Sequence, residues 1–202
     1  MFTLSLNRIA TLCVVAFLSA LVLIGSASGQ SDESGNVKTS FKAVRMGGTG
    51  PVMPATGTSL SRNNGGVFVT THVQGLTPGT VVTAWLVAFN NPKYCATNPC
   101  SVADIANPDV DASPVYIGGR IIGLDGAATY GAYRSVGDAT GWNGGGTGNG
   151  LVNPLGAEIH IALRTHGPAS ADPAILAMQL STFNGGCPPN MCATFAASIF
   201  QR

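Results

Sequence analysis

Short apolar segments separated by Gly, Pro and Asn recur along most of the chain. In the segment 67–74 (VFVTTHVQ) the residues alternate, so that two different sets of side chains face opposite sides. The segment 80–89 (TVVTAWLVAF) is instead apolar on both sides, which predicts a central strand covered on both faces. Segments of this length, bounded by turn residues, are typical of β-strands.

The same pattern predicts eight or nine short strands in total. The further segments are residues 55–60, 115–122, 127–134, 157–165, 175–183 and 193–200, with an early strand at 41–46. The turn 63–66 (NNGG) can adopt positive φ angles and joins its two neighbouring strands as a hairpin. Only residues 101–106, which begin at Ser101, predict a short helical turn. We therefore expect an all-β fold, an antiparallel sandwich or barrel-like structure with little helix.

One long segment, residues 137–153 (GDATGWNGGGTGNGLVN), is too rich in glycine for a stable strand or helix. It fits no phosphate-binding glycine register, and no helix pattern follows it. The segment therefore predicts a mobile surface loop that exposes Trp142. The chain's other tryptophan, Trp85, lies within the predicted central strand and is expected to be buried.

The N-terminal residues have the three parts of a secretory signal peptide. Arg8 precedes an apolar stretch at residues 9–24, and small residues follow up to Gly29. The apolar stretch is shorter than the roughly 20 residues that span a membrane, although retention as an anchor is the alternative. We expect a signal peptide at residues 1–29, a disordered polar spacer at 30–39 and a single β-sandwich domain at 40–202. The mature protein is then secreted, or periplasmic or in the cell envelope, without a membrane segment.

Four cysteines beyond the leader form two copies of one spacing, Cys95-x4-Cys100 and Cys187-x4-Cys192. Each copy follows a Phe-Asn dipeptide at the end of an apolar segment. An even cysteine count in an exported chain indicates disulfides, and three connectivities are possible. Prolines within both short loops favour the two local pairs. Zinc ligation is the alternative, but the cysteines have neither C-x-x-C spacing nor a histidine beside them in the sequence.

The charges are few and scattered, with 10 Lys or Arg against 9 Asp or Glu. A nucleic-acid partner requires a basic face, and none is present in this sequence. The G-x-S-x-G motif of serine hydrolases is also missing. We therefore expect no nucleic-acid binding, and expect the partner to be an extracellular protein, a glycan or another surface ligand.

The densest polar cluster is the segment 158–166 (EIHIALRTH). In a strand, Glu158, His160, Arg164 and His166 share one face while the aliphatic residues between them enter the core. Glu158, His160 and His166, with His72 from another strand, would satisfy zinc or another transition metal. The alternative is a structural polar face on which Glu158 pairs with Arg164. The spacing matches neither the helical H-E-x-x-H of zinc proteases nor an H-x-H motif.

The segment 50–79 resembles the start of a chordin-type CHRD domain. It has Gly50-Pro-Val-Met-Pro54, then Thr56-Gly-Thr58, a Gly-Gly turn, a V-x-V-x-V strand and Gly75-Leu-Thr-Pro-Gly79. The residues 83–86 (TAWL) replace that family's histidine-rich strand, and its terminal G-E-I-R-G pattern is not found. The remainder is similar to exported proteins of unknown function. The resemblance implies an extracellular β-rich domain without a catalytic role.

These observations favour a secreted, non-enzymatic β-sandwich that acts as an interaction or structural module without a cofactor. The runner-up function is a metal-dependent enzyme or metal-binding protein that uses the face of Glu158, His160 and His166.

Overall fold

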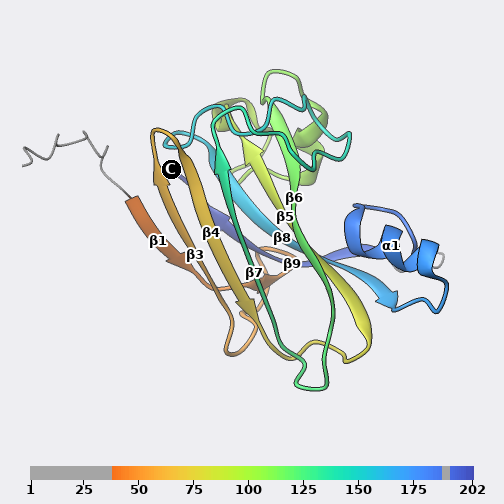
Figure 1. Cartoon of the computed structure of the whole chain (residues 1–202). Helices are drawn as coiled ribbons and strands as arrows, with labels where there is room; N and C mark the ends of the chain where they lie inside the picture. The colour runs from red at the N-terminus through yellow and green to blue at the C-terminus, as the bar shows by residue number, and fades with distance from the viewer. Residues whose placement is uncertain (1–37, 188–191) are drawn as a thin grey trace, which may run out of the picture. The chain divides into compact units, whose positions relative to one another are not determined.

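A computed structural model describes residues 38–187 and 192–202 of the chain (Figure 1). The strands are β1 (Lys38–Lys42), β2 (Arg45–Met46), β3 (Gly57–Asn63), β4 (Gly66–Val73), β5 (Thr80–Phe89), β6 (Ala112–Ile121), β7 (Ala128–Ser135), β8 (Glu158–Pro168) and β9 (Ala193–Phe200). The helices are η1 (Pro92–Tyr94), η2 (Val102–Ala106) and α1 (Pro173–Ser181).

The strands form two antiparallel sheets in the described part of the chain. The four-stranded sheet has the order β1-β3-β4-β7, and the five-stranded sheet has the order β2-β9-β8-β5-β6. The tight turn predicted at residues 63–66 joins β3 and β4, with Asn63 paired to Gly66. The expected all-β, antiparallel, sandwich-like fold is confirmed.

The two sheets bury their apolar faces against each other. Leu60 and Val69 of the four-stranded sheet pack in one cluster with Leu86, Ile161 and Phe200 of the five-stranded sheet. All five are at most 1% exposed. Burial of a large aliphatic or aromatic side chain contributes about 1.5–3 kcal/mol. This core fixes which face of β8 remains to point outward.

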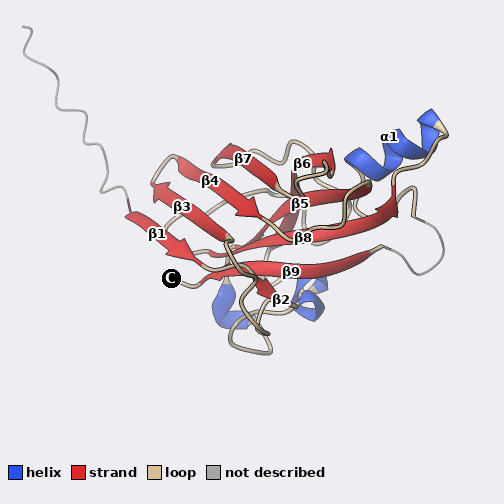
Figure 2. Cartoon of the chain, turned by 90° about the horizontal axis from the view of Figure 1, so that it is seen from below, coloured by secondary structure: helices blue, strands red, loops and turns tan. Residues whose placement is uncertain are grey.

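The outer face of the five-stranded sheet is also covered, which explains why β5 is apolar on both sides. Near the end of β5, Phe89 packs with Ile105 of η2. Farther back along β5, Trp85 is fully buried and contacts the rings of Tyr116 and Phe183 edge-on. Figure 2 shows α1 and the two short helices at separate places along this sheet. The expected burial of Trp85 is confirmed.

The strand predicted at residues 175–183 is wrong, because residues 173–181 form helix α1. Asp172 caps the helix by accepting from the backbone N–H groups of Ala174 (2.8 Å) and Ile175 (3.3 Å). Pro173 occupies the first turn, where its missing N–H costs nothing. A short apolar segment rich in Ala, Leu and Met suits either structure, and the Asp-Pro start decides for the helix.

The glycine-rich segment 137–153 is a loop, as predicted, but hydrogen bonds fasten it to β6 of the five-stranded sheet. Thr147 N donates to Ala112 O (2.8 Å), and Gly150 N donates to the hydroxyl of Ser113 (3.1 Å). Trp142 donates through its indole N–H to Gly145 O (2.8 Å) and remains 42% exposed. The expected exposure of Trp142 is confirmed.

The expected signal peptide at residues 1–29 and most of the expected spacer lie outside the described residues. Lys38 and Thr39, the last two residues of the expected spacer, belong to β1. No helix in the described part of the chain is long and apolar enough to cross a membrane.

Candidate functional site

The candidate site lies on the outer face of the five-stranded sheet, along β8. Ile159, Ile161 and Leu163 of this strand are buried in the core between the sheets. In the pairing with β5, His160 lies opposite Val87, and Arg164 lies opposite Thr83. The polar residues of β8 therefore project outward, as the alternation predicted.

At one end of this face, Glu158 joins β8 to the first disulfide loop. Its carboxylate accepts from the backbone N–H of Cys100 (2.7 Å) and from Nε2 of His160 (2.6 Å). Because a carboxylate only accepts hydrogen bonds, Nε2 carries the hydrogen, and Nδ1 of a neutral His160 is an acceptor. The predicted Glu158–Arg164 pair is wrong, since Glu158 pairs with His160 instead.

In the middle of the face, Arg164 holds the chain that leads to the second disulfide. Its Nε donates to Phe183 O (2.5 Å), and the guanidinium carbon lies 4.1 Å from the centre of the Phe183 ring. Its terminal nitrogens donate to Thr194 Oγ1 (3.0 Å), Asn184 Oδ1 (2.5 Å) and Cys192 O (3.3 Å). These contacts occupy four of the five N–H groups of the guanidinium.

No carboxylate in the described part of the chain forms an ion pair with Arg164. Loss of solvation on burial lowers the pKa of Arg164 below its ordinary value. A guanidinium nevertheless stays charged in proteins. The middle of the outer face therefore carries a positive charge whose described hydrogen-bond acceptors are all neutral oxygens.

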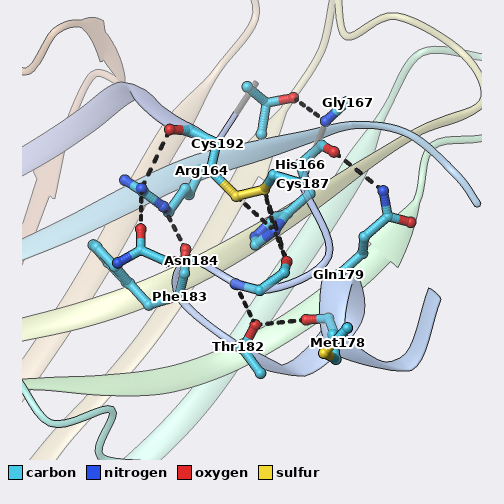
Figure 3. Close-up of a disulfide and its surroundings, with 12 residues drawn as sticks. Arg164, His166, Gly167, Met178, Gln179, Thr182, Phe183, Asn184, Cys187 and Cys192 are labelled. Carbon is cyan, nitrogen blue, oxygen red and sulfur yellow. Dashed lines mark hydrogen bonds between the residues drawn. A yellow bond between two sulfur atoms is a disulfide. The ribbon is translucent and has the colours of Figure 1, made fainter. Parts of the chain in front are cut away.

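At the far end of the face, His166 lies against the second disulfide (Figure 3). Its Nδ1 is 3.2 Å from Cys187 Sγ, 3.5 Å from Cys192 Sγ and 3.2 Å from Gly185 O. Its Nε2 is 2.9 Å from Thr83 Oγ1, which also accepts from the indole N–H of Trp85 (2.8 Å).

The imidazole of His166 is fully buried. Burial lowers its pKa below the ordinary value of 6.5, and the Arg164 charge lowers it further. The hydrogen bond to Gly185 acts in the opposite direction but does not reverse the shift. His166 is therefore neutral at physiological pH.

A mostly apolar groove of about 660 Å³ lies on this face, beside the loop of the first disulfide. Its apolar lining includes Val87, Phe89, Ala162, Phe183 and Ile199. The polar side chains of His160 and Arg164 also line it. Its volume lies within the range of about 300–1,000 Å³ that small-molecule sites have.

The disulfide connectivity is the local one that the prolines favoured. Cys95 pairs with Cys100 and Cys187 pairs with Cys192, with Cα–Cα distances of 5.3 and 5.4 Å. Phe89 and Phe183, from the two Phe-Asn dipeptides that precede these pairs, both line the groove. Residues 97–100 of the first ring also line the groove, so the Cys95–Cys100 disulfide constrains one of its sides.

The four predicted metal ligands are not brought together. Glu158 and His160 form one pair, whereas His166 lies six residues farther along the strand, about 20 Å away at 3.3 Å per residue. His72 belongs to the four-stranded sheet, where its ring contacts Thr129 Oγ1 (3.0 Å) and Gln74 Nε2 (3.1 Å).

Within residues 38–187 and 192–202, one group of at least three His, Cys, Asp or Glu side chains could hold a metal ion. It consists of His166, Cys187 and Cys192. The sequence shows no histidine beside these cysteines, but the fold places His166 there. The anchoring role of Arg164 was also missed, because all four of its bonded oxygens come from residues 183–194.

Comparisons of the chain with protein-family models, with curated proteins and with solved structures found no match. No relative's activity can therefore be carried over to this chain.

Proposed function

We propose that this chain is an exported, non-enzymatic interaction module that binds an amphipathic acid in the groove of the five-stranded sheet. The apolar part of the ligand lies along the groove, and its anionic group lies at Arg164. The observation that carries this proposal is a positive charge without a described carboxylate partner on the wall of an apolar groove.

The rigid frame of the groove supports ligand binding. The Cys95–Cys100 disulfide closes the loop that lines one side of the groove, and Asp104 fastens this loop by accepting from Ala96 N (2.7 Å) and Ser101 N (2.7 Å). A groove that is already ordered spends less conformational entropy when a ligand binds.

The hydrogen-bond donors of Arg164 support the proposal that the ligand carries an anionic group. One of its two Nη1 hydrogens has no partner among the described residues, and the guanidinium lines the groove. A carboxylate can accept from that N–H while it neutralises the charge. A neutral head group of the same size gains no such charge-assisted hydrogen bond.

The surroundings of His160 favour binding over catalysis. Nucleophilic catalysis uses a Ser, Thr or Cys hydrogen-bonded to its base. In the described part of the chain the hydrogen-bond partner of the His160 ring is Glu158, and no hydroxyl or thiol is bonded to it.

The proposal keeps export through a signal peptide at residues 1–29 and the extracellular context that the CHRD resemblance implies. The segment that carries the resemblance, residues 50–79, holds β3 and β4. None of the groove residues belongs to this segment. The resemblance therefore assigns no ligand to the groove.

Titration calorimetry with a long-chain alkyl carboxylate and with the alcohol of equal chain length tests the proposal. Wild type should bind the carboxylate about tenfold more tightly, because one charge-assisted hydrogen bond contributes about 1.5 kcal/mol or more. Arg164→Gln should abolish that preference. Arg120→Gln is the matched control, since Arg120 donates to Thr129 O and does not line the groove.

Arg164→Gln removes both the charge and the hydrogen bonds that hold the following segment, so a second variant is needed to test the groove without changing Arg164. Ala162→Phe fills the floor of the groove and leaves Arg164 unchanged, so it should weaken binding of both ligands alike. Circular dichroism of each variant verifies the fold. If wild type binds neither ligand, or binds both equally and Ala162→Phe changes nothing, the groove is not the binding site.

A further inference from the structure

The second disulfide differs from the first in having an imidazole against it. Cys187 and Cys192 both contact Nδ1 of the buried His166. The three candidate ligand atoms lie within 4.8 Å of one another. Both cysteines are half-buried, so the group is partly accessible from their side.

We propose that reduction of the Cys187–Cys192 disulfide creates a binding site for a thiophilic d10 cation, Zn²⁺ or Cu⁺, with His166 as the third ligand. In the oxidised protein the disulfide prevents metal binding, and in the reduced protein the two thiolates are free to bind the ion. This inference goes beyond the proposed function and does not depend on it, because the groove ligand contacts Arg164 and the metal contacts other atoms.

The distances support a three-ligand site. With Zn–S bonds of about 2.3 Å and Zn–N bonds of about 2.0–2.1 Å, ligand atoms around one ion lie about 3.5–3.8 Å apart. The two N–S distances, 3.2 and 3.5 Å, are already close to that value. The two sulfurs must separate from a covalent bond of about 2.0 Å to about 3.8 Å.

The chemistry of the donors selects the class of metal. Thiolate is a soft ligand that favours Cu⁺ and Zn²⁺, and imidazole also suits both metals. Two cysteines and one histidine leave a fourth position of a tetrahedral ion open, as in some zinc sites. Hard cations such as Mg²⁺ and Ca²⁺ prefer oxygen and are not expected here.

The hydrogen bonds of His166 already provide the support that a ligating imidazole needs. In the disulfide form, Nδ1–H can donate to Gly185 O while the Thr83 hydroxyl donates to Nε2. When Nδ1 binds a metal, the ring hydrogen moves to Nε2, which then donates to Thr83 Oγ1. Metal-bound histidines regularly donate their other N–H in this way.

The first disulfide serves as a comparison within the same chain. Cys95 and Cys100 have the same spacing, but the charged group beside them is Glu158, which accepts from Cys100 N (2.7 Å). No third ligand joins that pair within the described residues. Reduction of both disulfides should therefore create one metal site and not two.

The redox step balances with an external dithiol as reductant. One reductant thiolate attacks a cysteine sulfur, the disulfide breaks and a mixed disulfide forms. The second reductant thiolate resolves the mixed disulfide, so the reductant leaves as its own disulfide and two cysteine thiols remain. The bound cation then replaces the two thiol protons, which pass to solvent.

Metal analysis of the purified exported protein tests the proposal. The protein is reduced with a dithiol, freed of reductant without oxygen, mixed with excess Zn²⁺ and desalted. Reduced wild type should retain about one zinc per chain, and oxidised wild type should retain none. With Co²⁺ as the probe, the reduced protein should show thiolate-to-cobalt charge transfer and tetrahedral d–d bands.

Variants assign the ligands. His166→Gln and Cys187→Ser/Cys192→Ser should each weaken zinc binding at least tenfold, whereas Cys95→Ser/Cys100→Ser should keep wild-type stoichiometry. The last variant is the matched control for loss of a disulfide of equal spacing. Unchanged zinc content and cobalt spectrum in His166→Gln, zinc in the oxidised protein, or loss of zinc in the control would each overturn the proposal.

Discussion

His166 is held neutral by its surroundings. The ring has no exposed surface, its nitrogens face a hydroxyl, a carbonyl and two sulfurs, and the nearby charge of Arg164 has the same sign as an imidazolium. Protonation of this ring in the folded state would place a second positive charge beside the first in a desolvated position. The imidazole of His166 therefore binds a proton less readily in the folded protein than in the unfolded chain.

This difference makes the stability depend on pH. The pKa of His166 is lowered on folding from its ordinary value of 6.5, so its contribution is complete above that pH. As the pH falls below 6.5, the unfolded chain binds a proton and the folded protein does not, so stability is lost down to the folded pKa. The slope from one group is at most about 1.4 kcal/mol per pH unit.

Urea unfolding at pH 8, 7, 6 and 5 measures this slope. His166→Gln cannot take up the proton and should lose less stability than wild type between about pH 6.5 and 5. Equal slopes in the two proteins would show that His166 does not carry this dependence.

At the scale of one element, α1 is held against the five-stranded sheet by hydrogen bonds to β6 and β8. Tyr116 donates through its hydroxyl to Leu180 O (2.5 Å). Gln179, itself buried, donates to the backbone oxygens of His166 (3.1 Å) and Pro168 (2.9 Å). The helix therefore joins the outer face of β6 to the end of β8.

The N-cap of α1 provides a test of this role. Asp172→Ala removes the acceptor for two backbone N–H groups and should lower the free energy of unfolding by about 0.5–2 kcal/mol. Asp172→Asn is the control, because asparagine caps a helix about as well as aspartate. Chemical denaturation followed by circular dichroism measures both. A loss of equal size in the asparagine variant would point to the charge and not to the cap.

The strands could be predicted from the sequence where apolar and polar residues alternate, or where turn residues bound an apolar segment. The predicted segments 80–89 and 193–200 match β5 and β9 in full. The helix was missed because nine apolar-rich residues fit both periods, and its start depends on the cap of Asp172. Whether a short apolar segment forms a helix or a strand depends on the capping residues at its ends, and a hydrophobic periodicity does not include them.

At the scale of the whole molecule, the site combines residues that are distant in sequence. His166 is 21 residues from Cys187, and the two meet because the chain returns to the sheet after α1. Strand alternation was enough to place His160 and Arg164 on the outer face. The histidine–sulfur contact depends on the path of a loop, which no local pattern in the sequence encodes.

Export and oxidation can be tested on the intact protein. We expect the mature chain to begin near Gln30 and to contain no free thiol, because both cysteine pairs are disulfides. Intact mass spectrometry of exported protein measures the leader, and alkylation before and after reduction counts the thiols. All four cysteines beyond the leader should react only after reduction. A retained leader, or alkylation without reduction, would contradict this expectation.

The alternation along β8 has a consequence for how this protein can evolve. Ile159, Ile161 and Leu163 maintain the core, while His160 and Arg164 face the groove. Substitutions at the outward positions leave the core side chains unchanged, but they remove the bonds by which His160 holds Glu158 and Arg164 holds Phe183, Asn184 and Cys192. A single-residue insertion or deletion within β8 would exchange the two sets at once. Lineages should therefore tolerate length changes in the loops around β8 and accumulate only substitutions within it.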